Sequence, residues 1–417
     1  MRHDSLNLFL PQFIDKQEAI SCTESARFRV GWAHSAGRKS RMEDFLLIQG
    51  QFRNRRDEDL FAVFDGHTGP EAGLFVAENF SRILGQMLFE TDQLNEESLF
   101  LECEQSHLEL EPPDSVQSPE CARIALALHR TFLGVRDELE QKVDDSGTTV
   151  LVAFFAGDHF FIANAGDTRA VLGRGSGESL RLSVDHKPDW PPERKRIEAC
   201  GGRVVMASVP RVDGLLAVSR CLGDFDLEPR GLSCRPHICV LESHLPDEGE
   251  FVILASDGLW DVLKEEEAVS LVAKYFSQSQ AEGGVSSMYG SGCDMETVAC
   301  RKLVEKAYAR ESVDNISVVI IRLTEAGFSD DRETASLSLK SFPRPISLQD
   351  TVTSFSSASS LNRRHLDSPC ASSPAWAKKS DDGAGARFPS RSPDVDAEEV
   401  EFVPTSPATD DSIFDLQ

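Results

Sequence analysis

Short apolar runs separated by turn residues dominate the chain up to about residue 325. Runs bounded by Gly, Asn and Asp predict strands at 27–34, 43–50, 60–64, 148–155, 159–165, 251–256 and 316–323. Apolar residues at helical spacing predict helices over 70–89, 120–142, 191–200, 265–276 and 295–310. Hairpins outnumber clear strand–helix–strand units, so the pattern indicates an α+β protein and leaves the topology open.

The same pattern divides the chain into three parts. We expect an N-terminal leader over residues 1–25, a folded domain over 26–325 and a disordered acidic tail over 326–417, where Ser, Pro, Asp and Ala dominate. Within the domain, the acidic stretch 91–119 is expected to be an exposed insertion. The Ser- and Gly-rich stretch 277–294 is expected to be a mobile loop.

Charge and cysteine content exclude several function classes. The chain of 417 residues carries a net charge of −26, which disfavours nucleic acid and anionic membrane surfaces as partners. It contains no run of 18 apolar residues, so we expect no membrane span. Ten cysteines are scattered without a CxxC pair, which argues against a zinc ribbon and fits a reducing compartment. The expected location is therefore the cytoplasm, the nucleus or both.

Carboxylates recur where the predicted strands begin or end. Three follow apolar runs, namely Asp65, Asp167 and Asp257, and two pairs precede strands, namely Glu43-Asp44 and Asp314-Asn315. A strand holds a side chain rigidly, and hard divalent cations prefer oxygen ligands of this kind. A single Asp-Gly pair is usually an ordinary turn. The repetition of the arrangement in one domain favours a metal centre instead.

The ordered motifs of the chain resemble a known family, the metal-dependent protein phosphatases of the type 2C class. The matching blocks are Met42-Glu43-Asp44, Phe64-Asp65-Gly66-His67-Thr68-Gly69, Ser146-Gly147-Thr148-Thr149, Ala163-Asn164-Ala165-Gly166-Asp167-Thr168-Arg169, Asp185-His186-Lys187-Pro188, Leu216-Ala217-Val218-Ser219-Arg220 with Gly223-Asp224, Ala255-Ser256-Asp257-Gly258-Leu259-Trp260-Asp261 and Asp314-Asn315-Ile316-Ser317. Each block alone is weak, but the ordered set over about 27–325 is highly specific. The termini and the stretch 91–119 lie outside it.

This resemblance implies a four-layer α-β-β-α sandwich, with two antiparallel sheets flanked by helices and a binuclear metal site at one edge. It also implies roles for individual residues. Asp65 would bridge two Mn²⁺ or Mg²⁺ ions and the Gly66 carbonyl would add a ligand. Asp257 and Asp314 would complete one ion and Glu43 the other, and Asp167 with Asp261 would hold a weaker third ion.

The implied reaction is the hydrolysis of phosphoserine and phosphothreonine in proteins by a metal-bridging hydroxide, without a phosphoenzyme. Asp44 would orient the attacking water, and His67 would be the general acid for the leaving alkoxide. We expect phosphoprotein substrates and a monomer. Kinases that recognise Ser-Pro are expected partners of the tail, which carries such sites at Ser368, Ser373, Ser392 and Ser406.

One position departs from the family pattern. The family usually has an arginine three residues before the methionine of the Met-Glu-Asp block, where it binds the phosphate. Here that position is Lys39, and Arg38 precedes it. A lysine offers a point charge, whereas an arginine offers a two-pronged donor. Either residue is a candidate for the phosphate contact, and two solvated basic residues are the alternative.

Other chemistries are weaker fits. None of the ten cysteines has an arginine six positions later, which excludes the Cys-x5-Arg loop of tyrosine phosphatases. Asp224-Phe225-Asp226 mimics the nucleophile motif of haloacid-dehalogenase phosphatases, but it does not end an apolar strand. The main alternative is a catalytically weak or dead relative that acts as a scaffold. The presence of Glu43, Asp65, Asp257 and Asp314 favours an enzyme.

Overall fold

A computed structural model describes residues 20–111, 118–143, 145–242, 250–281 and 294–323. The tail 326–417, most of the leader 1–25 and most of the stretch 277–294 lie outside these residues. Every strand and helix predicted from the apolar pattern is present, with ends that differ by a few residues.

Two β-sheets form the centre of the domain. The larger sheet has the order β1-β3-β4-β8-β9-β15-β6, and its strands are β1 (Ile20–Thr23), β3 (Phe45–Gln49), β4 (Glu58–Phe64), β6 (Glu109–Glu111), β8 (Val150–Ala156), β9 (His159–Ala165) and β15 (His237–Glu242). The second sheet has the order β11-β10-β16-β17-β2, and its strands are β2 (Arg29–Ser35), β10 (Arg169–Gly173), β11 (Ser179–Arg181), β16 (Phe251–Ala255) and β17 (Ile316–Arg322).

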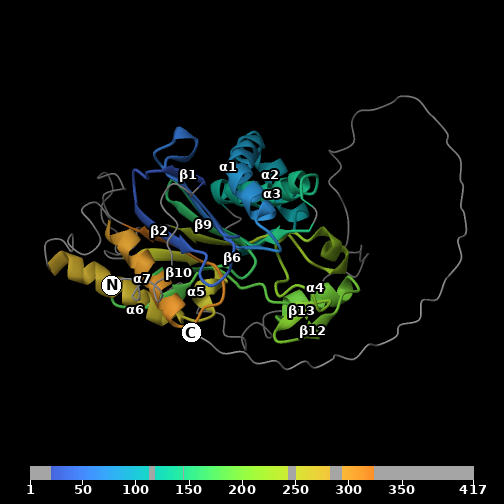
Figure 1. Cartoon of the computed structure of the whole chain (residues 1–417). Helices are drawn as coiled ribbons and strands as arrows, with labels where there is room; N and C mark the ends of the chain where they lie inside the picture. The colour runs from blue at the N-terminus through green and yellow to red at the C-terminus, as the bar shows by residue number, and fades with distance from the viewer. Residues whose placement is uncertain (1–19, 112–117, 144, 243–249, 282–293, 324–417) are drawn as a thin grey trace, which may run out of the picture. The chain divides into compact units, whose positions relative to one another are not determined.

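Helices cover the outer faces of both sheets, as Figure 1 shows. The larger sheet packs against α1 (Glu71–Asp92) and α3 (Pro119–Leu139) in one hydrophobic cluster. The second sheet packs against α6 (Glu265–Ala281) and α7 (Met295–Ala309), with the short helix α5 (Asp257–Trp260) at its end. A third cluster fills the space between the sheets. The predicted four-layer sandwich is therefore confirmed.

Strand β4 shows why the central strands have continuous apolar sequences. Its side chains are all buried. Leu60, Ala62 and Phe64 pack in the cluster with α1 and α3, whereas Phe61 and Val63 pack in the cluster between the sheets. Because successive side chains of a strand point to opposite faces, residues 60–64, which are covered on both faces, are all apolar. The first two residues, Glu58 and Asp59, are buried in ion pairs with Arg53 and Arg27.

The described residues of the stretch 91–119, which are 91–111 and 118–119, are folded, so the prediction of an exposed insertion is wrong for them. Asn95 caps α2 (Glu96–Gln105) by accepting a hydrogen bond from the Ser98 amide at 2.8 Å. Leu99 and Cys103 of this helix are buried against α3. Strand β6 adds an edge strand to the larger sheet, in parallel with β15. The acidic residues that suggested exposure lie on the outer face of a partly buried helix.

Strand β1 corrects a second boundary. It lies inside the predicted leader 1–25 and pairs in parallel with β3, so the sheet begins before residue 26. Both parallel pairs, β1 with β3 and β6 with β15, lie at the edges of the larger sheet. The predicted description of the sheets as antiparallel therefore holds for their central strands.

Two smaller sheets complete the described fold. One has the order β14-β7-β5 and consists of β5 (Gly66–His67), β7 (Gly147–Thr148) and β14 (Leu222–Gly223). The other is a hairpin of β12 (Val204–Met206) and β13 (Pro210–Val212), which follows α4 (Pro191–Ala199). Short 3-10 helices lie at Phe52–Asn54 (η3) and Phe225–Arg230 (η5). Within the described residues, no helix has the length and apolar character needed to cross a membrane.

Candidate functional site

Strand pairing brings the predicted carboxylates to one edge of the sandwich. Asp65 follows β4 and Asp44 precedes β3, and these two strand ends are neighbours because Phe45 pairs with Phe64. Asp257 follows β16 and Asp314 precedes β17, which are also antiparallel neighbours. Antiparallel pairing places the end of one strand beside the start of the next, so residues distant in sequence meet here.

Three of the carboxylates converge closely. Oxygens of Asp65, Asp167 and Asp257 all lie within 4.8 Å of one another, an arrangement that can hold a metal ion. The Asp257 amide approaches Asp65 Oδ2 at 3.5 Å. Thr149 fixes the Asp65 turn, because its amide donates to the Asp65 carbonyl at 2.9 Å and its hydroxyl accepts from the Asp65 amide at 3.3 Å.

Close backbone packing joins Asp257 to Asp314. Gly258 lies directly against the residue after Asp314, since a Cβ on Gly258 would lie 1.8 Å from the Asn315 carbonyl oxygen. Ser312 also donates to the Gly258 carbonyl at 2.7 Å. Glycine at position 258 therefore allows the start of α5 to reach the loop that carries Asp314.

The carboxylates strongly perturb one another. Burial, followed by the charges of Asp44, Asp257, Asp167 and Asp314, raises the pKa of Asp65 well above its usual value. Burial and the charge of Asp167 likewise raise the pKa of Asp257. Such groups are costly to ionise together unless cations neutralise them. The donor set therefore fits hard divalent cations with oxygen ligands.

Asp44 lies just behind this cluster. Its carboxylate is 2 % exposed, and neither oxygen has a well-aligned hydrogen-bond partner among the described residues. Burial raises the pKa of Asp44 to about 6, against the opposing effect of the Ser317 hydroxyl. A buried acceptor without a donor is rare in proteins, and a water held at the cluster would supply the missing donor.

Glu43 and Gly66 meet through their backbones. A Cβ on Gly66 would lie 2.3 Å from the Glu43 carbonyl oxygen, so the turn after β4 packs onto the loop before β3. The Glu43 side chain lies 3.7 Å from the Lys39 ammonium nitrogen. Asp261 follows α5, and its amide donates to the Asp257 carbonyl at 2.8 Å. Its side chain is exposed at the rim of the cluster.

The structure separates the two candidate phosphate ligands. Lys39 extends into the cluster, where its ammonium group pairs with Asp314. Burial by itself lowers the pKa of Lys39, but the hydrogen bond to Asp314 and the nearby carboxylate charges outweigh it and raise the pKa. Arg38 points elsewhere, because its guanidinium lies 4.9 Å from the centre of the Tyr308 ring on α7.

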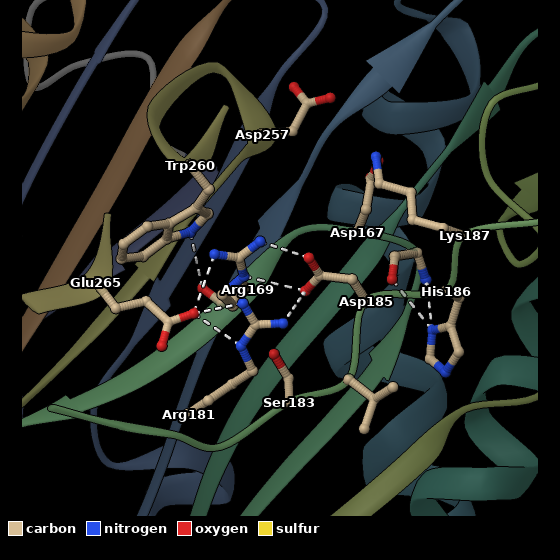
Figure 2. A network of polar contacts seen from close by, with 12 residues as sticks. Asp167, Arg169, Arg181, Ser183, Asp185, His186, Lys187, Asp257, Trp260 and Glu265 are labelled. Carbon is tan, nitrogen blue, oxygen red and sulfur yellow. Dashed lines mark hydrogen bonds and ion pairs between the residues drawn. The ribbon is translucent and has the colours of Figure 1, made fainter. Parts of the chain in front are cut away.

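Lys187 is a residue of the site that sequence reasoning did not single out. It belongs to the quoted Asp185-His186-Lys187-Pro188 block, and its ammonium pairs with Asp167. Figure 2 shows the Lys187 side chain lying beside Asp167. Burial opposes the charged form, but the charges of Asp167, Asp257 and Asp261 raise the pKa of Lys187. The cluster thus holds two ammonium groups, which its carboxylates outnumber.

An ion-pair network supports the strand that follows Asp167. Arg169 contacts Asp185 at 2.5 Å and Glu265 at 3.1 Å, and Arg181 also contacts Glu265 at 2.5 Å. Trp260 donates its indole N–H to the Ala255 carbonyl at 2.9 Å. Figure 2 shows this network on one side of Asp167 and Asp257. It links β10, β11, α5 and α6 below the carboxylates and so holds their backbones in place.

His67 lies next to the cluster in sequence and on the small sheet in space. Its Nε2 lies 2.6 Å from Asp224 Oδ2. Asp224 therefore lies at the site. From the sequence it was included only in the Gly223-Asp224 block and in the Asp224-Phe225-Asp226 motif, with no role assigned to it. Asp224 follows the two-residue strand β14 and so does not end a long apolar strand, as the nucleophile motif of haloacid-dehalogenase phosphatases would require.

The sequence of the chain is similar to those of known proteins. The family profile described as "Protein phosphatase 2C" matches residues 28–316. The chain is 34% identical over 301 residues to "Probable protein phosphatase 2C 45" of Oryza sativa subsp. japonica, covering 72% of this chain and 89% of that protein. It is 34% identical over 309 residues to "Probable protein phosphatase 2C 59" of Arabidopsis thaliana, covering 74% and 82%.

The fold is also found among solved structures. The structure described as "serine-threonine phosphatase 2C from Toxoplasma gondii" aligns with a TM-score of 0.55 and 24% identity, covering 75% of this chain and 99% of that one. At this identity the likeness concerns the fold alone. The profile carries the comparison further, because its match to residues 28–316 spans the blocks that contribute the carboxylates.

Proposed function

The chain belongs to the protein phosphatase 2C family, and from this premise we propose that its carboxylate cluster binds two Mn²⁺ or Mg²⁺ ions for the hydrolysis of phosphoserine and phosphothreonine. Members of the family are metal-dependent protein serine/threonine phosphatases, so the predicted enzyme class and phosphoprotein substrates follow from membership. The observation that carries the proposed site is the convergence of Asp65, Asp167 and Asp257 within 4.8 Å.

We assign the ligands by position in the cluster. Asp65 lies centrally and would contact both ions, with the Gly66 carbonyl beside it. Asp257 and Asp314, joined through Gly258, would hold one ion, and Glu43 would hold the other. Asp167 and the exposed Asp261 would hold a weaker third ion, for which Lys187 competes through its contact with Asp167. When bound, such cations acidify a water molecule and neutralise charge on the phosphoryl oxygens.

The protein's own side chains account for the remaining steps. Asp44 would accept a hydrogen bond from the attacking water, because its buried oxygens have no aligned donor. Lys39 would bind a phosphoryl oxygen, because its ammonium reaches the cluster and Arg38 does not. His67 would donate a proton to the serine or threonine oxygen as it leaves.

A scaffold without activity is the alternative function. Nothing in the described site favours it, since every predicted carboxylate of the binuclear site lies at the same edge. The test is phosphate release from a phosphoserine peptide with added Mn²⁺ or Mg²⁺ and with excess chelator. Calorimetric titration of Mn²⁺ should show binding that Asp257→Asn weakens at least tenfold. Turnover that persists in excess chelator would contradict the proposal.

Three further parts of the proposal concern the protein's setting. We propose a monomer located in the cytoplasm, the nucleus or both, as the acidic charge and dispersed cysteines suggest. We also propose that proline-directed kinases modify the tail at Ser368, Ser373, Ser392 and Ser406, which lie outside the described residues. Sedimentation, cell fractionation and phosphopeptide mapping test these points in turn.

A further inference from the structure

The small three-stranded sheet brings two polar side chains together across a glycine. Its central strand β7 contains Gly147, which pairs with His67 of β5 on one side and with Gly223 of β14 on the other. Asp224 follows β14 directly. His67 and Asp224 therefore approach each other from opposite sides of a residue that has no side chain.

The contact depends on that missing side chain. His67 Nε2 lies 2.6 Å from Asp224 Oδ2. A Cβ on Gly147 would lie 2.4 Å from His67 Nε2 and 2.0 Å from Asp224 Oδ2. These distances are shorter than any carbon can tolerate. The pair occupies the space above Gly147, so any larger residue there would separate His67 from Asp224.

The backbone conformation of Asp224 directs its side chain to His67, and the side chain does not cap the helix that follows. Its φ of 49° lies in the left-handed region, which aspartate tolerates better than most residues. Asp224 is the N-cap of η5, yet its side chain makes no capping hydrogen bond. The carboxylate instead accepts from His67 and, at 3.4 Å, from the Cys221 thiol. Both donors share the oxygen Oδ2.

A metal site formed by His67, Cys221 and Asp224 is the competing interpretation, because their ligand atoms lie within 4.8 Å of one another. The 2.6 Å contact leaves no room for a cation between nitrogen and oxygen. Burial, with the charge of Asp224, also raises the pKa of Cys221 well above its usual value, which keeps the thiol protonated. A hydrogen-bonded dyad fits these distances better.

We propose that Asp224 is a positioning residue that holds the His67 ring through Nε2 and so leaves Nδ1 as the nitrogen that donates the proton to the leaving group. A carboxylate only accepts hydrogen bonds, so Nε2 must carry a hydrogen. No hydrogen bond to Nδ1 occurs among the described residues, so Nδ1 is the ring nitrogen left to donate to the substrate. The inference rests on the proposed function, in which His67 is the general acid.

The proton then has a defined route. Water adds its oxygen to phosphorus, and the bond from phosphorus to the serine or threonine oxygen breaks. That oxygen leaves with the bonding electron pair and takes the proton from Nδ1. The imidazole is left neutral, with its Nε2 hydrogen still bound to Asp224. The proton released from the attacking water restores the charged ring, so the cycle ends with alcohol and phosphate.

Substitution of Asp224 tests the role through the choice of leaving group. In Asp224→Gly the left-handed backbone is relaxed and the carboxylate is lost. We expect kcat for a phosphoserine peptide to fall about 10- to 100-fold, with KM changed less than about threefold. p-Nitrophenyl phosphate should lose less than about threefold in kcat, because its phenolate leaves without a proton. Asp224→Asn keeps an acceptor and should retain most peptide activity.

Asp213→Gly is the matched control. Asp213 also has a left-handed backbone, with φ of 47°, and it accepts a hydrogen bond from the Arg203 amide at 2.8 Å. Its loss should leave the ratio of the two activities unchanged. If Asp224→Gly lowers both activities equally, Asp224 is merely structural and the proposal is wrong.

A double-mutant cycle and the ring tautomer complete the test. His67→Gln combined with Asp224→Gly should be no slower on the peptide than His67→Gln alone, whereas additive losses would overturn the proposal. In ¹⁵N-histidine spectra of the full chain, neutral His67 should carry its hydrogen on Nε2 and become a tautomer mixture in Asp224→Gly. Hydrogen on Nδ1 in the wild type would contradict the assignment. This readout needs no turnover, so it still decides the matter if the phosphatase proposal itself fails.

Discussion

The Asn315 side chain accepts a hydrogen bond from the Glu43 amide at 2.7 Å. Its Nδ2 also donates to the carbonyls of Ala36 and Arg41, at 3.0 and 2.9 Å. One buried amide thus ties the loop that carries Lys39 and Glu43 to the residue after Asp314. The two halves of the proposed metal centre are held together by a residue outside the proposed ligand set.

Asn315→Ala should therefore loosen both the fold and the cation site. It leaves three partly buried backbone groups without their partner, and we expect a loss of about 2–4 kcal/mol in the free energy of unfolding. The Mn²⁺ concentration for half-maximal activity should rise, because Glu43 is no longer held. Urea denaturation and activation curves measure the two effects. Asn79→Ala, which removes only contacts within one helix, with the Phe75 carbonyl and the Arg82 guanidinium, is the control, and equal effects would contradict the role.

Asp65→Asn should stabilise the metal-free protein while abolishing catalysis. Because the pKa of Asp65 is raised in the folded state, the ionised carboxylate costs stability at neutral pH. That cost disappears as the pH falls through the folded pKa toward the unfolded value of about 3.9. In chelator at pH 7.5 the melting temperature should rise by about 2–5 °C, and the gain should shrink toward pH 4.

The same variant should lower kcat with added Mn²⁺ by at least about 100-fold. Differential scanning fluorimetry and steady-state kinetics on one preparation provide both measurements. Asp226→Asn, on the exposed surface of η5, should change neither. An Asp65→Asn protein that melts at or below the wild-type temperature in chelator would show that charge repulsion at this site is negligible.

Alanine variants of the neighbouring residues Lys39 and Arg38 should differ sharply in KM for a phosphopeptide. Lys39→Ala removes the ammonium that reaches the cluster, and KM for a phosphopeptide should rise about tenfold, the loss of one charged hydrogen bond. Lys39→Arg should be tolerated, because a guanidinium also binds phosphate. Arg38→Ala should change KM less than about twofold, since Arg38 lies on Tyr308. A larger defect in Arg38→Ala would reverse the assignment.

The burial of α2, within the stretch 91–119, can be tested with two of its leucines. Leu99 is fully buried, whereas Leu101 is 51% exposed. Leu99→Ala should lower the free energy of unfolding by about 2–5 kcal/mol through lost burial and a cavity. Leu101→Ala should change it by less than about 0.5 kcal/mol. Chemical denaturation measures both, and similar small values would return the stretch to the status of an exposed insertion.

Sequence patterns were most reliable where the physical cause is local. Continuous apolar runs such as 60–64 mark strands covered on both faces, and helical spacing marks α1 and α3, because each side chain's burial follows from the period of its own element. The motif blocks identified the carboxylates, since hard cations require oxygen ligands whatever the topology. The stretch 91–119 was predicted to be exposed because most of its residues are acidic or polar. Its helix has only a narrow buried face, made by residues such as Leu99 and Cys103.

Only the tertiary structure decided which residues meet. Sequence alone left Lys39 and Arg38 as equal candidates, and the turn after β2 sends one to Asp314 and the other to Tyr308. The contacts of Asn315 with Glu43, Lys187 with Asp167 and Asp224 with His67 join residues 272, 20 and 157 positions apart. Such pairings depend on strand order and register, which long-range packing determines and which no local pattern of side chains encodes.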